Sequence, residues 1–353
     1  MIGHGGAACP RLLRAAAAIT DNLPACTRTD NWRTEVSEIA HRTVKANGIN
    51  IHIAEQGQGP LVLLVHGFPE LWYSWRHQLP ALAAAGYHAV APDVRGYGGS
   101  DAPEPIEAYA MTEHIAVAIG ILDAFGAVTA VIAGHDWGAP MAWNSAVLHP
   151  ERFRAVIALS VPFLQRSPAP PMQLFKQIFQ DNFFYMLYFQ TPGVAEAELE
   201  KDPRRSMRLF LFAASGDDTS EGAGFAGKKK GDQFLTGMQE PEKLPAWLKK
   251  EDIDYYAKEF ARTGFRGGLN RYRNMDRDWE QLPQLAGAKV QQPALFIGGE
   301  KDGVLRFTSL DPMKANVPNL REAVLLPGCG HWTQQERPAE VNAKLIEFLK
   351  ALP

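Results

Sequence analysis

A single aspartate at the centre of segment 134–138, Gly-His-Asp-Trp-Gly, is the residue best suited to covalent chemistry. The segment follows an aliphatic run at 128–133, which predicts a strand, and precedes a predicted helix at 139–148. Glycines two positions before and after Asp136 permit the sharp strand-to-helix turn, the nucleophile elbow, that raises one side chain above a sheet. A carboxylate there suits attack on saturated carbon, because the product is an alkyl ester. The alternative is that Asp136 only caps the following helix.

Two later segments supply side chains that would complete a catalytic triad. His331 follows the predicted strand 321–326, and Asp302 follows the predicted strand 294–297 in a glycine-rich loop. Either residue alone would be an ordinary loop side chain. Their order along the chain is nucleophile, acid and base, each after a strand, which is the order expected with such an elbow. We therefore predict that Asp302 orients His331 and that His331 is the general base.

Backbone hydrogen-bond donors are expected beside the aspartate. Residues 66–70, His-Gly-Phe-Pro-Glu, come directly after the aliphatic run 61–65, which predicts another central strand. When water attacks an ester of Asp136, negative charge collects on a carbonyl oxygen, and the N–H groups of Phe68 and Trp137 are the predicted donors. An ordinary strand-to-helix turn is the alternative interpretation of this segment.

Strand and helix patterns alternate between about residues 61 and 160. This alternation is typical of a parallel sheet covered by helices on both faces. The expected strands are 41–45, 50–55, 61–65, 88–91, 128–133, 155–159, 294–297 and 321–326. The expected helices are 71–85, 109–125, 139–148, 175–189, 253–263 and 339–349.

The alternation stops at about residue 162. From there to about residue 285 the chain is rich in aromatic residues at helical spacing, and the strand pattern then resumes. Within this stretch, residues 216–231 are dense in Gly, Asp and Lys, which predicts an exposed loop with its lysines in solvent. Those lysines are Lys228, Lys229 and Lys230. The predicted organisation is an α/β core at 32–161 and 286–353, a helical cap at 162–285 and a disordered extension at 1–31.

Composition excludes several classes of protein. The chain has 353 residues, of which 46% are hydrophobic and 21% charged, so it can bury a large core. A net charge of −3 gives no excess of cations with which to bind nucleic acid. No run reaches the roughly 18 apolar residues that a membrane span needs. Three cysteines without metal-ligand spacing predict no disulfide framework, no metal site and a reducing, cytoplasmic location.

Taken together, the motifs resemble those of the epoxide hydrolases of the α/β-hydrolase fold, in particular the hydrolase domain of the soluble epoxide hydrolases. The resemblance covers roughly residues 32–353 and implies a mostly parallel sheet flanked by helices, with an inserted helical cap. In this family a tyrosine from each of two cap segments hydrogen-bonds the epoxide oxygen. The matching positions are Tyr185 and Tyr272, with Tyr188 as the rival in the first segment. The segments that carry the resemblance are 66–70, 95–101, 134–138, 185–193, 264–274 and 328–334.

The resemblance implies conversion of lipophilic epoxides to vicinal diols by a hydrolase acting on an ether bond, without cofactor or metal. Phenols suit this reaction, because an opening epoxide leaves an alkoxide that needs a proton. Mammalian members carry a phosphatase domain ahead of the hydrolase. Here about 30 residues without pattern precede it, so no phosphatase activity is expected. The chain is expected to act as a monomer or homodimer.

Two alternative functions remain open. A haloalkane dehalogenase shares the aspartate nucleophile and often the tryptophan after it, but it holds a halide with N–H donors in place of two phenols. A hydrolase-fold protein that binds a ligand without catalysis is the second alternative. The presence of Asp136, Asp302, His331 and both cap tyrosines argues against a non-catalytic protein. Diol formation or halide release would discriminate between the enzymes.

Overall fold

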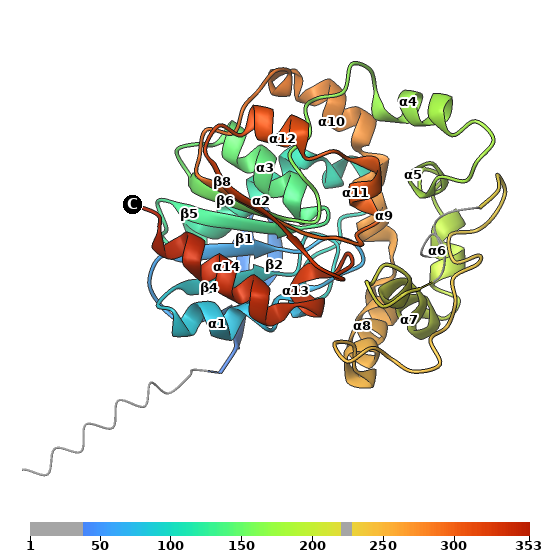
Figure 1. Ribbon diagram of the computed structural model, residues 1–353, viewed down its shortest axis with the longest axis horizontal. Coiled ribbons are helices and arrows are strands. Elements are labelled where there is room, and N and C mark those ends of the chain that lie inside the picture. The colour runs from blue at the N-terminus through green and yellow to red at the C-terminus, as the bar shows by residue number, and fades with distance from the viewer. Residues whose placement is uncertain (1–37, 220–227) are drawn as a thin grey trace, which may run out of the picture. The chain divides into compact units, whose positions relative to one another are not determined.

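The computed structural model describes residues 38–219 and 228–353, and these residues contain one eight-stranded sheet (Figure 1). The strand order is β1-β2-β4-β3-β5-β6-β7-β8. β2 pairs antiparallel with β1 and β4, and all other neighbours are parallel. All eight expected strands are present, whereas the extension predicted at 1–31 lies outside the described residues. The strands are β1 Ala40–Ala46, β2 Ile49–Gln56, β3 Leu61–Val65, β4 His88–Pro92, β5 Ala130–His135, β6 Phe153–Leu159, β7 Ala294–Gly299 and β8 Leu320–Leu326.

Helices cover both faces of the sheet, which confirms the predicted α/β class. α1 and α14 pack on one face, and α2 and α3 pack on the other (Figure 1). β3 and β5 are buried at every position, because parallel strands between two helical layers carry aliphatic side chains toward both. The helices of the core are η1 Trp72–Trp75, α1 Gln78–Ala84, η2 Ile106–Tyr109, α2 Met111–Ala124, α3 Gly138–Leu148, α11 Val304–Phe307, α12 Asp311–Asn316, α13 Thr333–Glu336 and α14 Pro338–Lys350.

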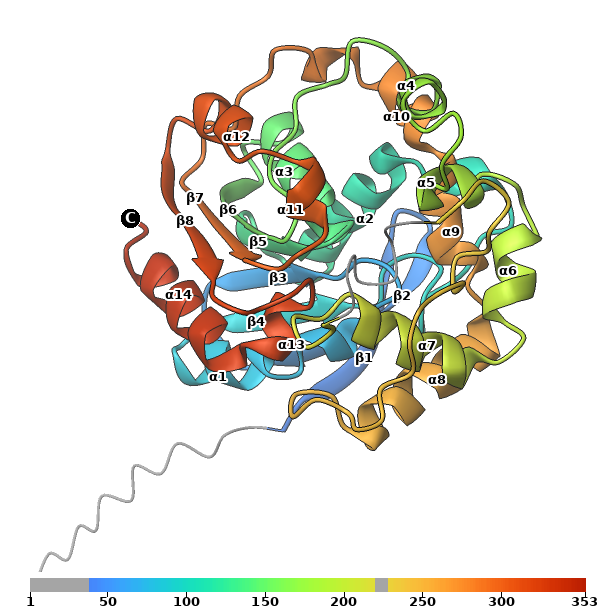
Figure 2. The ribbon, with the colours of Figure 1, turned by 45° about the vertical axis from the view of Figure 1, so that its right-hand side comes forward.

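The chain between β6 and β7, here called the cap segment, is helical in its described part (Figure 2). Its described residues contain no strand of the sheet, as the missing aliphatic runs predicted. None of the helices among the described residues is long and apolar enough to cross a membrane. The helices of the cap segment are α4 Pro171–Ile178, α5 Tyr185–Tyr188, α6 Val194–Leu199, α7 Pro203–Ala213, α8 Lys250–Thr263, α9 Arg266–Arg273, α10 Met275–Gln281 and η3 Pro283–Leu285.

The single helix expected at 175–189 is divided into α4 and α5. Between them the backbone pairs with a distant part of the cap segment: Asn182 forms a β-bridge with Lys229, and the Phe183 N–H donates to Lys228 O at 3.3 Å. These contacts compete with helical hydrogen bonds, and sequence periodicity alone does not reveal them.

The prediction that Lys228 lies in solvent was wrong, although Lys229 and Lys230 are exposed. Lys228 is 8% exposed, and its Nζ donates to the carbonyl oxygen of Phe234. Its ammonium lies 5.2 Å from the ring centroid of Phe183. Burial lowers the pKa of Lys228 to about 8. The ammonium also lies 5.5 Å from the ring centroid of Phe234, and the electron-rich faces of these two rings attract a cation, which helps to explain the burial.

The carboxyl ends of the parallel strands meet at one edge of the sheet, and the segments that carry the predicted nucleophile, acid, base and backbone donors begin there. The elbow follows β5, and the loop 66–70 follows β3. Asp302 and His331 come after β7 and β8. In open α/β sheets this edge is where ligands bind.

Candidate active site

The turn that carries Asp136 has the strained geometry of a nucleophile elbow. Asp136 has a φ of 50°, in the left-handed region that non-glycine residues rarely occupy. The flanking positions must be glycine, because a side chain at either one would clash with the backbone. A Cβ on Gly134 would lie 1.9 Å from Gly138 O, and one on Gly138 would lie 2.0 Å from Val65 O. The close approach of β5, α3 and β3 therefore fixes the position of the aspartate.

The two carboxylate oxygens of Asp136 face different parts of the site. Oδ1 accepts a hydrogen bond from the Phe68 N–H at 2.8 Å, and Oδ2 lies 3.5 Å from His331 Nε2. Gly67 lets the loop come this close, because a Cβ there would lie 2.3 Å from Asp136 Oδ1 and 2.6 Å from Trp137 N. The structure thus brings the Phe68 N–H to the carboxylate and Trp137 N close to the same point above Gly67, and the role of both N–H groups as oxyanion donors stays a prediction.

Asp302 and His331 form a buried pair. His331 Nδ1 lies 3.2 Å from Asp302 Oδ1 and 3.3 Å from Oδ2, and the Val304 N–H donates to Oδ1 at 2.9 Å. Burial alone would lower the pKa of His331, but the negative charges of Asp302 and Asp136 raise it well above its usual value. Burial would raise the pKa of Asp302, whereas His331 and other donors hold it below its usual value. His331 is therefore set between two carboxylates.

The loop that carries His331 is anchored at both the core and the cap segment. The Glu336 carboxylate accepts from the Gly330 N–H at 2.8 Å and from the Trp332 N–H at 3.0 Å. The His331 N–H itself donates to Ala214 O, directly after α7, at 2.9 Å. These contacts position the imidazole independently of its own ring hydrogen bonds.

A buried pair that we did not predict, Glu70 and His135, joins three of the motif segments. His135 Nδ1 lies 2.7 Å from Glu70 Oε2, and His135 Nε2 lies 2.7 Å from His331 O. Both ring nitrogens of His135 therefore face oxygen atoms, one on a carboxylate and one on a backbone carbonyl. Glu70 also accepts from the Gly67 N–H at 2.9 Å and from Gln334 Nε2 at 2.9 Å. The signal was present in the sequence, since both residues stand inside the motifs.

Tyr185 in α5 and Tyr272 in α9 come together above the sheet edge. Their ring centroids are 6.0 Å apart, and the Tyr272 ring meets that of Trp137 edge-on at 5.1 Å. Burial, followed by the negative charge of Asp136, raises the pKa of both phenols. A hydrogen bond from the Trp137 side chain acts in the opposite direction on Tyr272. Both tyrosines therefore stay protonated and able to donate near neutral pH.

Tyr188, the rival of Tyr185, points to another partner. Its hydroxyl donates to Glu198 Oε2 at 2.9 Å, and Glu198 also accepts from the Phe234 and Leu235 N–H groups. That carboxylate holds the following loop of the cap segment. The geometry favours Tyr185 as the partner of Tyr272.

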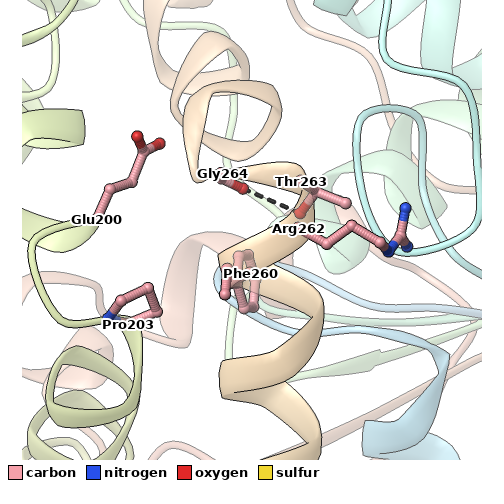
Figure 3. Close-up of a pocket in the computed structure, with 7 residues that line it drawn as sticks. Glu200, Pro203, Phe260, Arg262, Thr263 and Gly264 are labelled. Atoms are coloured by element: carbon pink, nitrogen blue, oxygen red, sulfur yellow. Dashed lines mark hydrogen bonds between the residues drawn. The ribbon is translucent and has the colours of Figure 1, made fainter.

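A cavity of about 510 Å³ lies elsewhere, between the end of α6 and the end of α8 (Figure 3). In Figure 3, Glu200 and Pro203 lie on one side of the cavity, with Phe260 and Thr263 on the other. Its lining holds none of the predicted site residues. In the described ranges 38–219 and 228–353, no cluster of three or more His, Cys, Asp or Glu side chains is placed to hold a metal ion.

Comparison with known proteins supports the class that this geometry indicates. The family described as alpha/beta hydrolase fold matches residues 60–338. Epoxide hydrolase A of Mycobacterium tuberculosis (strain ATCC 25618 / H37Rv) is 51% identical over 315 residues, 88% of this chain and 97% of that protein. Bifunctional epoxide hydrolase 2 of Rattus norvegicus is 42% identical over 319 residues, 89% of this chain and 56% of that protein. The crystal structure of epoxide hydrolase A from Mycobacterium thermoresistibile has a TM-score of 0.86 at 50% identity, and the match covers 90% of this chain and 99% of that one.

The sheet, the strained elbow and the helical insertion define a hydrolase of the α/β-hydrolase fold. Within that class, the chain belongs to the epoxide hydrolases, because its identity to these proteins extends over most of its length. The predicted fold and the predicted family are both confirmed.

Proposed function

We propose that this chain converts lipophilic epoxides to vicinal diols through a covalent ester on Asp136. The observation that carries the proposal is the position of the Asp136 carboxylate, with the Phe68 N–H at 2.8 Å on one oxygen and His331 Nε2 at 3.5 Å from the other. The nearby Tyr185 and Tyr272 supply two protonated phenols. Together these groups provide the nucleophile, the base and the two acids that the proposed reaction needs.

In the first step, an oxygen of Asp136 forms a bond to an epoxide carbon while the bond from that carbon to the ring oxygen breaks. The ring oxygen becomes an alkoxide and takes a proton from Tyr185 or Tyr272. In the same surroundings an alkoxide is more basic than a phenolate, so a phenol can donate its proton to the ring oxygen as the C–O bond breaks. The product is a hydroxyalkyl ester.

In the second step, His331 takes a proton from water, and the resulting hydroxide attacks the ester carbonyl of Asp136. The negative charge on the carbonyl oxygen is received by the N–H groups of Phe68 and Trp137. The ester C–O bond at the carbonyl carbon then breaks, the departing alkoxide takes the proton held by His331, and the diol leaves with one oxygen that came from Asp136. The proton left on the Asp136 carboxyl returns to the tyrosine that donated in the first step. Asp302 stabilises the imidazolium that forms on His331.

Aromatic side chains around the tyrosines support a preference for lipophilic substrates. The rings of Phe68, Phe189 and Trp137 all lie within 5.5 Å of the Tyr272 ring, centroid to centroid. Such a lining favours aryl and alkyl substituents over charged ones. A cytoplasmic location is proposed from the cysteine content alone, and Cys329 is free and buried.

Replacing the nucleophile tests this proposal. We expect Asp136→Ala to lose diol formation from styrene oxide by about a thousandfold or more, because no other carboxylate takes its place. Asp181→Ala, at an exposed cap position, is the matched control and should retain activity. Circular dichroism would verify that both variants fold. Undiminished diol formation by Asp136→Ala would overturn the nucleophile assignment.

The same assay addresses the dehalogenase alternative. An aspartate elbow followed by Trp137 would also suit halide displacement, but the second phenol has no role in holding a halide. We expect 1-bromobutane to release bromide far more slowly than styrene oxide gives diol. Faster bromide release than diol formation would favour the dehalogenase.

A further inference from the structure

Ser160 is a buried polar residue that the proposed mechanism leaves without a role. Among the described non-glycine residues, three have positive φ: Asn47 at 47°, Asp136 at 50° and Ser160 at 71°. Asn47 precedes Gly48 in the β1–β2 hairpin turn, where this conformation is common. Asp136 is the elbow residue. Ser160 follows β6 directly, and backbone strain at such a position, at a strand end beside an active site, indicates a functional constraint.

The side chain of Ser160 lies against the Asp302–His331 pair. Its Oγ lies 3.0 Å from His331 Nδ1, and its hydroxyl helps to hold the pKa of Asp302 below the usual value. A carboxylate only accepts, so the Ser160 hydroxyl donates to Asp302 and accepts from the Nδ1–H of His331. The residue is fully buried, and its N–H donates to Ile297 O at 2.9 Å, which extends the sheet and fixes the side chain.

The distances around His331 Nδ1 show why a third partner matters. Asp302 Oδ1 and Oδ2 lie 3.2 Å and 3.3 Å away, which is longer than the roughly 2.7–2.9 Å of a charge-assisted hydrogen bond. The contact with Ser160 Oγ, at 3.0 Å, is the shortest of the three. Asp302 alone therefore holds the imidazole of His331 loosely. The Ser160 hydroxyl restricts the range of orientations that this ring can adopt.

We propose that Ser160 is a positioning residue for the hydrolysis of the ester, an inference that rests on the proposed function. By holding the proton of His331 on Nδ1, it leaves the lone pair of Nε2 directed toward Asp136 and the attacking water. The other ionisable groups that face His331 are Asp136, Asp302 and His135, whose ring centroid lies 4.8 Å from that of His331. His135 approaches the ring and backbone of His331, not its Nδ1.

The proposal separates the two chemical steps. Ring opening depends on Asp136, whose carboxylate is oriented by the Phe68 N–H without any contact to Ser160. Ester hydrolysis depends on His331. Loss of the Ser160 hydroxyl should therefore slow the second step and leave the first unchanged, so that the ester accumulates.

Single-turnover measurements with styrene oxide test this, with the ester followed by intact-protein mass in quenched samples. In Ser160→Ala and Ser160→Gly, we expect ester hydrolysis to slow at least about tenfold and ring opening to stay within about twofold of the parent protein. Glycine adopts a positive φ without strain. Comparing Ser160→Gly with Ser160→Ala therefore separates the effect of losing the hydroxyl from the effect of backbone strain. Ser145→Ala is the matched control, because the buried Ser145 Oγ has no hydrogen-bond partner within the described structure. It should hydrolyse the ester at the parent rate.

A double variant tests whether Ser160 acts through His331. In a His331→Gln background, adding Ser160→Ala should not slow the residual ester hydrolysis further. An additional slowing of about tenfold would contradict a role through the histidine.

Two further outcomes would overturn the inference. Parent-like hydrolysis in both Ser160 variants would show that the hydroxyl has no positioning role. Slow hydrolysis in Ser160→Ala with parent-like hydrolysis in Ser160→Gly would assign the effect to the backbone instead. Failure of the proposed function looks different, because then no ester would be trapped even in the His331→Gln protein.

Discussion

The charge on His331 depends on the state of Asp136. In the free protein the imidazole lies between the carboxylates of Asp136 and Asp302, and these charges raise its pKa well above the usual value against the effect of burial. Conversion of Asp136 to an ester removes one of the two charges. The pKa of His331 should then fall, which frees Nε2 to accept a proton from water. In the proposed mechanism, formation of the ester thus prepares His331 to act as the base in the second step.

Removal of the base should trap the intermediate. We expect His331→Gln to form the ester but to hydrolyse it about a hundredfold to ten-thousandfold more slowly, because glutamine cannot take a proton from water. The peptide that contains Asp136 should carry the added mass of the epoxide. His149→Gln, at the end of α3 with its side chain partly exposed, is the control and should show no adduct at steady state. An unmodified peptide together with retained turnover in His331→Gln would contradict the assignment of the base.

The pH dependence of the second step follows from the same charges. Only neutral His331 acts as a base, so ester hydrolysis should be slow at acidic pH and rise as pH passes the pKa of His331 in the ester. That midpoint should lie below the pKa of His331 in the free protein, where Asp136 is still charged. Single-turnover rates across pH give the first value, and NMR titration of the free protein gives the second. Equal midpoints would show that the Asp136 charge does not act on His331.

The residues that sequence patterns failed to identify act across large separations in the chain. The proximity of Asp136, Asp302 and His331 could be predicted because each follows a strand in a recognisable motif, whereas their catalytic roles stay predictions. Ser160 has no motif, and its significance comes from its contact with His331, 171 positions further along the chain. Glu70 and His135 stand inside motifs, but their pairing is visible only in three dimensions.

Among the secondary-structure elements, the loop after β3 depends on a glycine to reach the nucleophile. Gly67 has no positive φ, so its requirement is steric: any Cβ would meet Asp136 Oδ1 and Trp137 N. The loop must approach this closely for the Phe68 N–H to bind the carboxylate.

A single methyl group tests this close approach. We expect Gly67→Ala to lower turnover by about a hundredfold to a thousandfold, because the displaced loop no longer offers the Phe68 N–H to the developing oxyanion. Gly303→Ala is the control, since a Cβ at Gly303 meets no atom within 4 Å although it lies beside Asp302. Turnover of styrene oxide and thermal unfolding should be measured for both. Parent-like turnover in a folded Gly67→Ala protein would mean that this donor is not used.

Continuous aliphatic runs predict the central strands well, because strands between two helical layers carry apolar side chains on both sides. The cap segment is less predictable. Aromatic residues at 175–189 suggested one helix, but pairing of Asn182 with Lys229 interrupts it. Next to this pairing Lys228 is buried, although the sequence around it predicted exposure. Long-range contacts therefore decide the local structure there.

In the whole molecule, the proposed mechanism requires the cap segment to hold Tyr185 and Tyr272 near Asp136. Arg271, one residue before Tyr272 in α9, links the two parts. Its guanidinium lies 4.7 Å from the ring centroid of Trp137, pairs with Asp278 and donates to Tyr109 O. The buried cation thus ties α9 to both the elbow and the core.

Loss of this buried cation should weaken both stability and ring opening. We expect Arg271→Met to lower the free energy of unfolding by about 3 kcal/mol, because it leaves Asp278 without its buried partner. Ring opening should slow as Tyr272 loses its fixed position. Arg266→Met, at an exposed position of the same helix, should change neither by a measurable amount. Urea denaturation and single-turnover rates would measure these effects. Equal unfolding free energies and equal ring-opening rates in the two variants would show that Arg271 does not hold Tyr272 in position.

Isotope transfer from water tests the central claim most directly. With enzyme in excess over styrene oxide in H₂¹⁸O, one turnover should place ¹⁸O in the Asp136 carboxylate and leave the diol unlabelled, because the diol carries away an original Asp136 oxygen. Mass spectrometry of the peptide and of the diol reads both outcomes. A labelled diol with an unlabelled Asp136 would show that water attacks the epoxide directly, and the covalent mechanism would be wrong.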